Sequence, residues 1–195
     1  GQVIIGPFAD GDVVENEKEN PLYSNFDYVL EIDGKIIGQV IYVRSEILCD
    51  DGRRIPIMTF GPIGIAPEYK RQGYGKLLLD YSMEKAVEMG VGALAITGNI
   101  LFYGKSGFVP AKTKGVRYAD DPEADYFLIK ELKHGFLDGV FGTYKDPEGY
   151  FVCENDRDGF EKFEATFPPK AIFIGALSIT AGKSSHLGIP GPILL

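Results

Sequence analysis

The stretch of sequence that decides the fold is IGIAPEYKRQGYGK, residues 63–76. Its apolar beginning predicts the end of a strand, and the polar residues that follow predict a loop. A helix is expected over residues 73–89, and it opens with Gly73 and Gly75. A strand that leads through a loop into a glycine-containing helix start is typical of an anion site, because unpaired amides and the helix dipole point toward the ligand.

Positive charge surrounds this predicted helix start. Lys70, Arg71 and Lys76 flank it, and no carboxylate falls in the first helical turn, where helices usually prefer one. The pattern therefore favours a site that is left open for a bound diphosphate.

Two other phosphate-binding motifs fail on spacing. The dinucleotide motif G-x-G-x-x-G requires a third glycine at position 78, which is Leu78. The P-loop motif requires Ser or Thr directly after its Gly-Lys pair, and that residue is Leu77. Another Gly-Lys pair, in the sequence Gly-Lys-Ser at residues 182–184, lacks the required earlier glycine, since position 177 is Leu177. A nucleotide-binding P-loop protein is therefore disfavoured.

The flanking sequence predicts an α/β (α+β) domain with strands on both sides of the long helix. Asp33-Gly34 is a strong hairpin signal, and Gly61-Pro62 breaks the regularity of the strand around it. Asn99 is expected to cap a short helix over residues 100–106, which Gly107 ends. Strands are expected over residues 3–5, 28–32, 35–43, 55–65, 93–97 and 126–132.

Two segments resemble motifs of the GNAT family, the acetyl-CoA-dependent N-acetyltransferases. The sequence KRQGYG, residues 70–75, looks like the family's [QR]xxGx[GA] motif, and FYGKSGF, residues 102–108, is similar to its FYxxxGF element. The resemblance covers residues 25–132 and rests on the order and spacing of the two motifs. It implies an acyltransferase that moves an acetyl group from acetyl-CoA to a primary amine.

The resemblance also implies a fold and a set of site residues. The expected GNAT-like mixed sheet is flanked by helices, and its parallel strands 55–65 and 93–97 splay apart around acetyl-CoA. Tyr103 is the implied general acid for the leaving thiolate, and the Ile65 N–H is the implied oxyanion donor. The implied cofactor-binding residues are Ile63, Gly64 and Ile65 for the pantetheine arm, Lys70, Arg71, Gln72, Gly73, Tyr74, Gly75 and Lys76 for the pyrophosphate, and Asn99 near the opening. No metal is expected.

Two departures from the family pattern affect the acceptor side. Some members carry a glutamate base at the position of Thr59, and a threonine cannot serve as a base. Glu46, Asp50 or Asp51 could approach the acceptor instead, or could simply form a solvated turn. Water could also relay the proton, or the substrate could arrive deprotonated. The segment before Phe26 shows no clear helical period, although the family normally has helices there that shape the acceptor pocket. Either the N-terminal part is abbreviated or truncated, or the C-terminal extension shapes the pocket instead. These departures leave open an alternative, a non-catalytic acyl-CoA-binding or sensor module.

The sequence predicts a main domain and an extension. Residues 1–134 are expected to form the acetyl-CoA-binding domain, and residues 135–195 a β-rich extension packed on it. The extension is expected to contain a hairpin of residues 140–144 and 149–152 and a strand over residues 171–180, which could replace a missing family strand. Its tail, residues 181–195, is rich in Gly, Pro and Ser and is expected to be loosely ordered.

Composition bounds the partners. The chain has 195 residues, of which 45% are hydrophobic, enough for one domain with a core. A net charge of −8 argues against a nucleic-acid partner and mildly favours a cationic amine, either a small molecule or a peptide lysine.

No apolar run is long enough to span a membrane and no secretory signal is recognised, so a cytoplasmic location is expected. A disulfide between Cys49 and Cys153 and a homodimer are left open, whereas two histidines without a CxxC pair disfavour structural zinc.

Overall fold

A computed structural model describes residues 2–7 and 27–166 of the chain. The described residues fall into two compact units, one ending at Pro147 and one beginning at Glu148. No helix among these residues is long and apolar enough to cross a membrane. All of the predicted site residues belong to the first unit.

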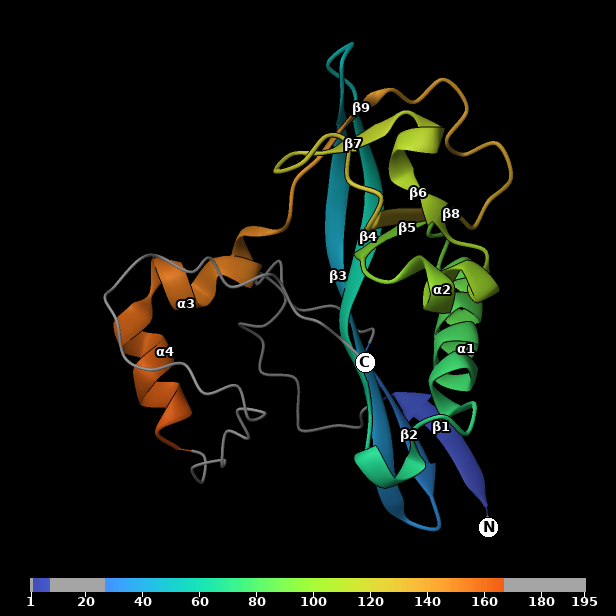
Figure 1. Cartoon of the computed structure of the whole chain (residues 1–195), viewed down its shortest axis with the longest axis vertical. Helices are drawn as coiled ribbons and strands as arrows, with labels where there is room; N and C mark the ends of the chain where they lie inside the picture. Colours follow the sequence, from blue (N-terminus) through green and yellow to red (C-terminus); the bar gives the residue numbers. More distant parts are fainter. Residues whose placement is uncertain (1, 8–26, 167–195) are drawn as a thin grey trace, which may run out of the picture. The chain divides into compact units, whose positions relative to one another are not determined.

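The first unit is built on a nine-stranded mixed sheet (Figure 1). Its main path has the order β1-β2-β3-β4-β5-β8-β6, and β9 pairs with both β3 and β7. The β2–β3 hairpin turns at Asp33 and Gly34, whose φ angles of 49° and 80° confirm the predicted turn. The strands are β1 (Val3–Pro7), β2 (Asp27–Ile32), β3 (Lys35–Cys49), β4 (Arg54–Ile65), β5 (Ala93–Thr97), β6 (Val109–Pro110), β7 (Val116–Tyr118), β8 (Phe127–Glu131) and β9 (Gly142–Tyr144).

The sheet opens between β4 and β5. These strands are parallel, and their register contains only the pairs Met58–Leu94 and Thr59–Ala95. Two residues later β4 contains the cis peptide bond Gly61–Pro62, and β4 then continues to Ile65 without β5 beside it. The predicted splayed pair of parallel strands is thus confirmed.

Helices line the open side of the sheet. After β4 the chain forms the 3₁₀ turn η2 (Pro67–Tyr69) and then α1 (Tyr74–Glu88), which leads back to β5. After β5 come α2 (Ile100–Tyr103) and the 3₁₀ turn η3 (Gly104–Ser106), which lie beside α1 (Figure 1). The Asn99 side chain accepts a hydrogen bond from the Leu101 N–H at 2.9 Å, which confirms the predicted cap.

Two hydrophobic clusters cover the two faces of the sheet. Successive residues of a strand point to opposite faces, so Met58 and Phe60 of β4 join one cluster and Ile57 joins the other. Leu78 and Leu79 of α1 are fully buried in the first cluster, and such burial contributes about 2 kcal/mol for each leucine. The first cluster therefore fixes α1 against the sheet next to the opening.

The C-terminal part differs from the prediction. Only β9 forms in the predicted hairpin of residues 140–152; η5 (Glu148–Phe151), α3 (Val152–Asn155) and α4 (Arg157–Glu164) follow it. The hairpin prediction is wrong because β9 pairs with the distant strands β3 and β7 instead of with its sequence neighbour. The predicted strand 171–180, the tail 181–195 and most of the segment before Phe26 lie outside the described residues.

Candidate functional site

The start of α1 carries a row of main-chain donors that have no acceptor among the described residues. Its N-cap is Gly73, with a φ of 91° and no side-chain cap, and Arg71 before it is also left-handed at 62°. The helical bonding begins at Leu77, whose N–H donates to the Gly73 carbonyl at 3.0 Å. Among the described residues, the N–H groups of residues 71–76 have no such acceptor. The first turn also contains no acidic residue, so the positive end of the helix dipole is uncompensated.

The open edge of β4 presents a second set of main-chain groups. The Ala66 N–H donates to the Ile37 carbonyl at 2.7 Å, and the register continues through the pairs Gly64–Gln39 and Ile63–Val40. Antiparallel pairs alternate between bonded and non-bonded positions. Gly64 therefore directs its main-chain groups to β3, whereas those of Ile63 and Ile65 point away from β3, toward the space that β5 has left.

A cavity of about 940 Å³ joins the helix start to this open edge. Nine of the twelve predicted site residues line it: Ile63, Ile65, Lys70, Arg71, Gly73, Gly75, Lys76, Asn99 and Tyr103. The remaining lining residues are Pro67, Tyr69, Phe102, Lys105 and Ser106. The cavity thus lies between residues 63–76 on one wall and residues 99–106 on the other.

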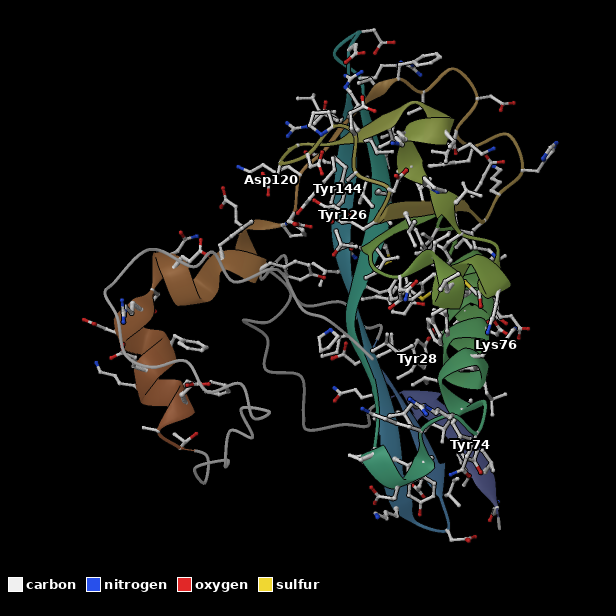
Figure 2. The ribbon with its side chains drawn as sticks, viewed as in Figure 1. Tyr28, Tyr74, Lys76, Asp120, Tyr126 and Tyr144 are labelled. Atoms are coloured by element: carbon white, nitrogen blue, oxygen red, sulfur yellow. The ribbon has the colours of Figure 1, made fainter. Side chains whose placement is uncertain are left out.

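Three predicted residues do not line the cavity. Gly64 turns its main-chain groups to β3, and the Gln72 side chain donates to the Glu68 carbonyl at 3.0 Å. The Tyr74 ring packs edge-on against Tyr69, with 6.2 Å between ring centroids. Figure 2 shows the side chains of Tyr74 and Lys76 on α1.

Sequence reasoning missed several lining residues that lie inside the two motifs. Phe102, Lys105 and Ser106 all belong to FYGKSGF, in which only the tyrosine was singled out. Their place next to Tyr103 on a short helix and 3₁₀ turn was the available signal. Pro67 and Tyr69 similarly belong to the loop before α1.

The charge of Lys76 is compensated within the protein. Its ammonium group forms an ion pair with Asp80 one turn later on α1. The same carboxylate accepts a hydrogen bond from the Ser106 hydroxyl at 3.1 Å. Asp80 therefore ties η3 to α1, and the Lys76 charge is less available to a ligand than the sequence suggested.

Tyr103 stands in an apolar wall of the cavity. Its side chain is 4% exposed, and its ring makes edge contacts with Phe60, Phe102 and Phe108. Burial raises the pKa of Tyr103 to about 12, because an apolar environment disfavours the phenolate. The hydroxyl is therefore fully protonated at neutral pH.

Thr59 has a structural partner at the point where the strands separate. Its hydroxyl donates to the Ala95 carbonyl at 3.0 Å, across the last parallel pair of β4 and β5, and the residue is 3% exposed. The hydroxyl thus reinforces the junction, and a threonine has no basic group to offer.

The carboxylates considered as alternative bases lie at the far turn of the β3–β4 hairpin. Asp51 is ion-paired with Arg53, and the Arg53 backbone N–H helps to hold the pKa of Asp51 below its usual value. Glu46 pairs with Arg54, and Asp50 pairs with Arg117. None of these three carboxylates is among the residues that line the cavity.

Comparison with known proteins finds a family model that matches the segment containing the cavity. The family model for the acetyltransferase (GNAT) domain matches residues 24–110, which contain both motifs and every lining residue of the cavity. This segment of the chain is therefore similar to the GNAT acetyltransferase domain. No curated protein sequence matches the chain.

Solved structures support the fold. A GNAT family N-acetyltransferase (YhbS) from Escherichia coli, in complex with CoA, matches with 23% identity and a TM-score of 0.58, over 64% of this chain and 68% of that chain. A GNAT family acetyltransferase from Brucella melitensis, in complex with acetyl-CoA, matches with 16% identity and a TM-score of 0.54, over 76% and 98%. The match to Eis1 from Mycobacterium abscessus (16% identity, TM-score 0.48) covers 56% of this chain and only 31% of that one. At these identities the first two matches establish the fold, and the third adds nothing to that conclusion.

Proposed function

We propose that the protein transfers an acetyl group from acetyl-CoA to a primary amine by direct attack. The observation that carries this proposal is the continuous cavity from the uncapped start of α1, along the open edge of β4, to Tyr103. A diphosphate, an extended amide-containing arm and a thioester follow one another in acetyl-CoA in the same order. The complexes of the two structural relatives with CoA and acetyl-CoA agree with this choice of donor.

The donor is held mainly by main-chain groups. The N–H groups of residues 71–76 bind the diphosphate, and Lys70 and Arg71 add positive charge beside it. The outward main-chain groups of Ile63 and Ile65 pair with the pantetheine arm as an added strand would. The Asn99 oxygen is used by its helix cap, which leaves its side-chain NH₂ group as a donor to the cofactor.

The chemical step follows from the groups near the thioester. The neutral amine attacks the carbonyl carbon, and the Ile65 N–H stabilises the oxyanion that forms. The tetrahedral intermediate loses the extra proton of its nitrogen to water, and the C–S bond breaks. Tyr103 protonates the departing thiolate, and the Tyr103 phenolate then recovers a proton from water, which leaves the amide and free CoA. The apolar wall that raises the pKa of Tyr103 also disfavours a thiolate. The pKa of the proton donor and the pKa of the leaving thiol are therefore raised together.

The acceptor is proposed to be a cationic amine, either a small molecule or a peptide side chain. The net charge of −8 supports this choice through electrostatic attraction. The amine must lose its proton before attack, and no carboxylate lines the described cavity to take it. We therefore assign this proton to water. We also propose the cytoplasm as the site of action.

The test is thiol release from acetyl-CoA in the presence of a panel of amines. Tyr103→Phe is expected to lower kcat by about 10²–10⁴-fold, as is typical for loss of a general acid, with little change in the Kd for acetyl-CoA. Tyr81→Phe on α1 is the matched control, because Tyr81 does not line the cavity. Full activity of Tyr103→Phe would remove this residue from the mechanism.

One observation favours a second function, that of a non-catalytic acyl-CoA sensor. The hydroxyl of Thr59 stands where a carboxylate base would be expected and is committed to Ala95. A sensor would bind CoA with a measurable Kd and release no thiol with any amine of the panel. An enzyme would bind CoA and would also release thiol with at least one of the amines.

A further inference from the structure

Asp27, the first residue of β2, has a carboxylate oxygen that is buried without a partner. Its Oδ1 atom has no hydrogen-bond donor within the described part of the chain, and the only other such atom there is the Ser45 hydroxyl oxygen. Burial raises the pKa of Asp27, because an apolar environment disfavours the carboxylate. Since buried polar atoms in proteins nearly always have a partner, this carboxylate is suited to a ligand.

The Asp27 side chain lies on the face of the sheet opposite α1. The next residue, Tyr28, points toward α1 (Figure 2), and its ring packs edge-on against Tyr81 of that helix, with 5.7 Å between ring centroids. Successive residues of a strand point to opposite faces. Thr59 of β4 lies on the same face as Asp27, because its neighbour Phe60 belongs to the cluster beneath α1.

The register of the sheet places Asp27 level with the opening between β4 and β5. Asp27 pairs with Ile41 of β3. On its other side Ile41 lies opposite Gly61 and Pro62, where the register of β3 and β4 shifts. These two residues follow Thr59, the last residue of β4 that pairs with β5. Two strand spacings of about 4.8 Å therefore separate Asp27 from the opening, or roughly 10 Å across the sheet.

The reacting end of the cofactor is expected at the same level. Tyr103, the proposed acid, packs against Phe60, the residue before Gly61, with 5.8 Å between ring centroids. Tyr103 and α1 occupy one face of the sheet, so an acceptor that reaches the thioester through the opening comes from the other face. A second positive group on that acceptor, roughly 10 Å from the reacting nitrogen, would then meet the Asp27 carboxylate.

We propose that Asp27 binds a second ammonium group of the acceptor, so that a long diamine is the preferred substrate. An ammonium group supplies both the charge and the N–H donors that the buried oxygen lacks, and it stays protonated at neutral pH because it titrates near ~10. This inference rests on the proposed function, because it assumes that the thioester lies beside Tyr103. The net charge attracts any cation, whereas Asp27 selects by the spacing between two amines.

The test compares two acceptors of equal length, the eight-carbon α,ω-diamine and octylamine, which differ in one terminal amine. Wild type is expected to show a kcat/KM about tenfold higher for the diamine, as one charge-assisted contact would provide. The difference should lie in KM, because the distant ammonium group is bound equally in the ground state and the transition state. The three-carbon diamine is too short to span the separation, so it should have no advantage over propylamine.

Asp27→Asn keeps the shape of the side chain and removes its charge. It is expected to reduce the ratio for the eight-carbon pair to about twofold or less, by raising the KM for the diamine. Glu31→Gln is the matched control and should keep the ratio, because Glu31 lies on the same strand and the same face, roughly 13 Å along the strand from Asp27. Calorimetric titration of both variants with acetyl-CoA shows that they are folded.

Three results would overturn the assignment of Asp27. They are equal kcat/KM values for the two eight-carbon amines in wild type, a tenfold ratio that survives in Asp27→Asn, and a ratio that Glu31→Gln lowers as much as Asp27→Asn does. Failure of the proposed function gives a different result, since wild type would then release no thiol with any of the four amines. The inference alone fails if wild type acetylates octylamine and the diamine alike.

Discussion

At the scale of single residues, the position of Tyr103 depends on a glycine that faces its ring. A Cβ atom added at Gly98 would lie 2.4 Å from the Cε2 atom of Tyr103. The Gly98 N–H donates to the Tyr126 carbonyl at 2.8 Å, so the backbone there is held against β8 and cannot easily retreat. The ring must therefore move if this glycine is replaced.

Gly98→Ala is expected to lower kcat by at least tenfold and to cost about 1–3 kcal/mol of stability, as overpacking of a buried site usually does. The matched control is Gly6→Ala on β1, where an added Cβ meets nothing within 4 Å. Steady-state kinetics and urea denaturation of both variants provide the measurement. Unchanged kcat in Gly98→Ala would show that the orientation of the Tyr103 ring does not matter.

The raised pKa of Tyr103 predicts a pH profile. Since the hydroxyl pKa is about 12, the proton-donating form persists through pH 10, and its loss begins only near pH ~11. The ratio of wild-type kcat to Tyr103→Phe kcat should therefore stay constant between pH 7 and pH 10. Taking the ratio cancels the titration of the amine. A ratio that falls above pH 9 would mean that the tyrosine titrates near its ordinary pKa.

At the scale of elements, the start of α1 combines a helix-capping site and a ligand site. A carboxylate at this end would interact favourably with the helix dipole. Its negative charge would, however, lie where the diphosphate is expected to bind. An added Cβ at Gly75 would meet Ile65 and Phe102 at 3.6 Å, which is ordinary contact, so this position accepts a small side chain. Stability and affinity are thus expected to respond in opposite directions.

Gly75→Asp is therefore expected to raise the stability of the free protein by about 0.3–1 kcal/mol through the dipole and to weaken CoA binding by at least tenfold. Gly75→Asn, which has nearly the same volume and no charge, separates the effect of charge from that of bulk. Thermal denaturation and titration calorimetry on the two variants give both quantities. If Gly75→Asp and Gly75→Asn bind CoA with equal Kd values, the diphosphate does not bind at this helix end.

The elements that the sequence predicted well are those with local signals. The helix start at residues 73–74 and the Asn99 cap follow from glycine positions and capping chemistry, which act within a few residues. The extension of β3 to Cys49 was missed, because Arg44 and Glu46 interrupt its apolar alternation. The length of β3 is instead set by its pairing with β4 and β9, which no local pattern reveals.

The same distinction separates the predicted and missed parts of the candidate site. Its glycines, cations and tyrosine fall inside recognisable motifs, and most of them do line the cavity. The ion pair between Lys76 and Asp80 and the commitment of Thr59 to Ala95 depend on rotamers and on strands that meet only in the folded chain. Such partners require a structure.

At the scale of the whole molecule, the limit of the first unit is set by β9. The sequence predicts a main domain of residues 1–134 with an extension packed on it, and β9 at residues 142–144 joins the sheet beside β3 and β7. Leu137, Val140 and Tyr144 are at most 5% exposed and belong to the second hydrophobic cluster. The residues just beyond 134 therefore contribute to the core of this unit.

A chain that ends at Pro147 is expected to keep a cooperative unfolding transition and the wild-type Kd for CoA, because every described cavity residue precedes it. A chain that ends at Lys133 is the matched comparison. It loses three buried apolar side chains and should be less stable by more than about 5 kcal/mol, or fail to fold. Equal stability of the two truncated chains would show that the residues between 134 and 147 add nothing to the core of the first unit.

The unsatisfied amides before Leu77 have one more consequence. Protons on nitrogen exchange with deuterium of the solvent at a rate set by how often they are free of an acceptor. In the unliganded protein, residues 71–76 should therefore take up deuterium almost as fast as an unstructured peptide, although they sit beside a rigid helix. Occupancy by a phosphorylated ligand would slow this uptake at these six positions, so isotope labelling could follow the filling of the site without any assay of turnover.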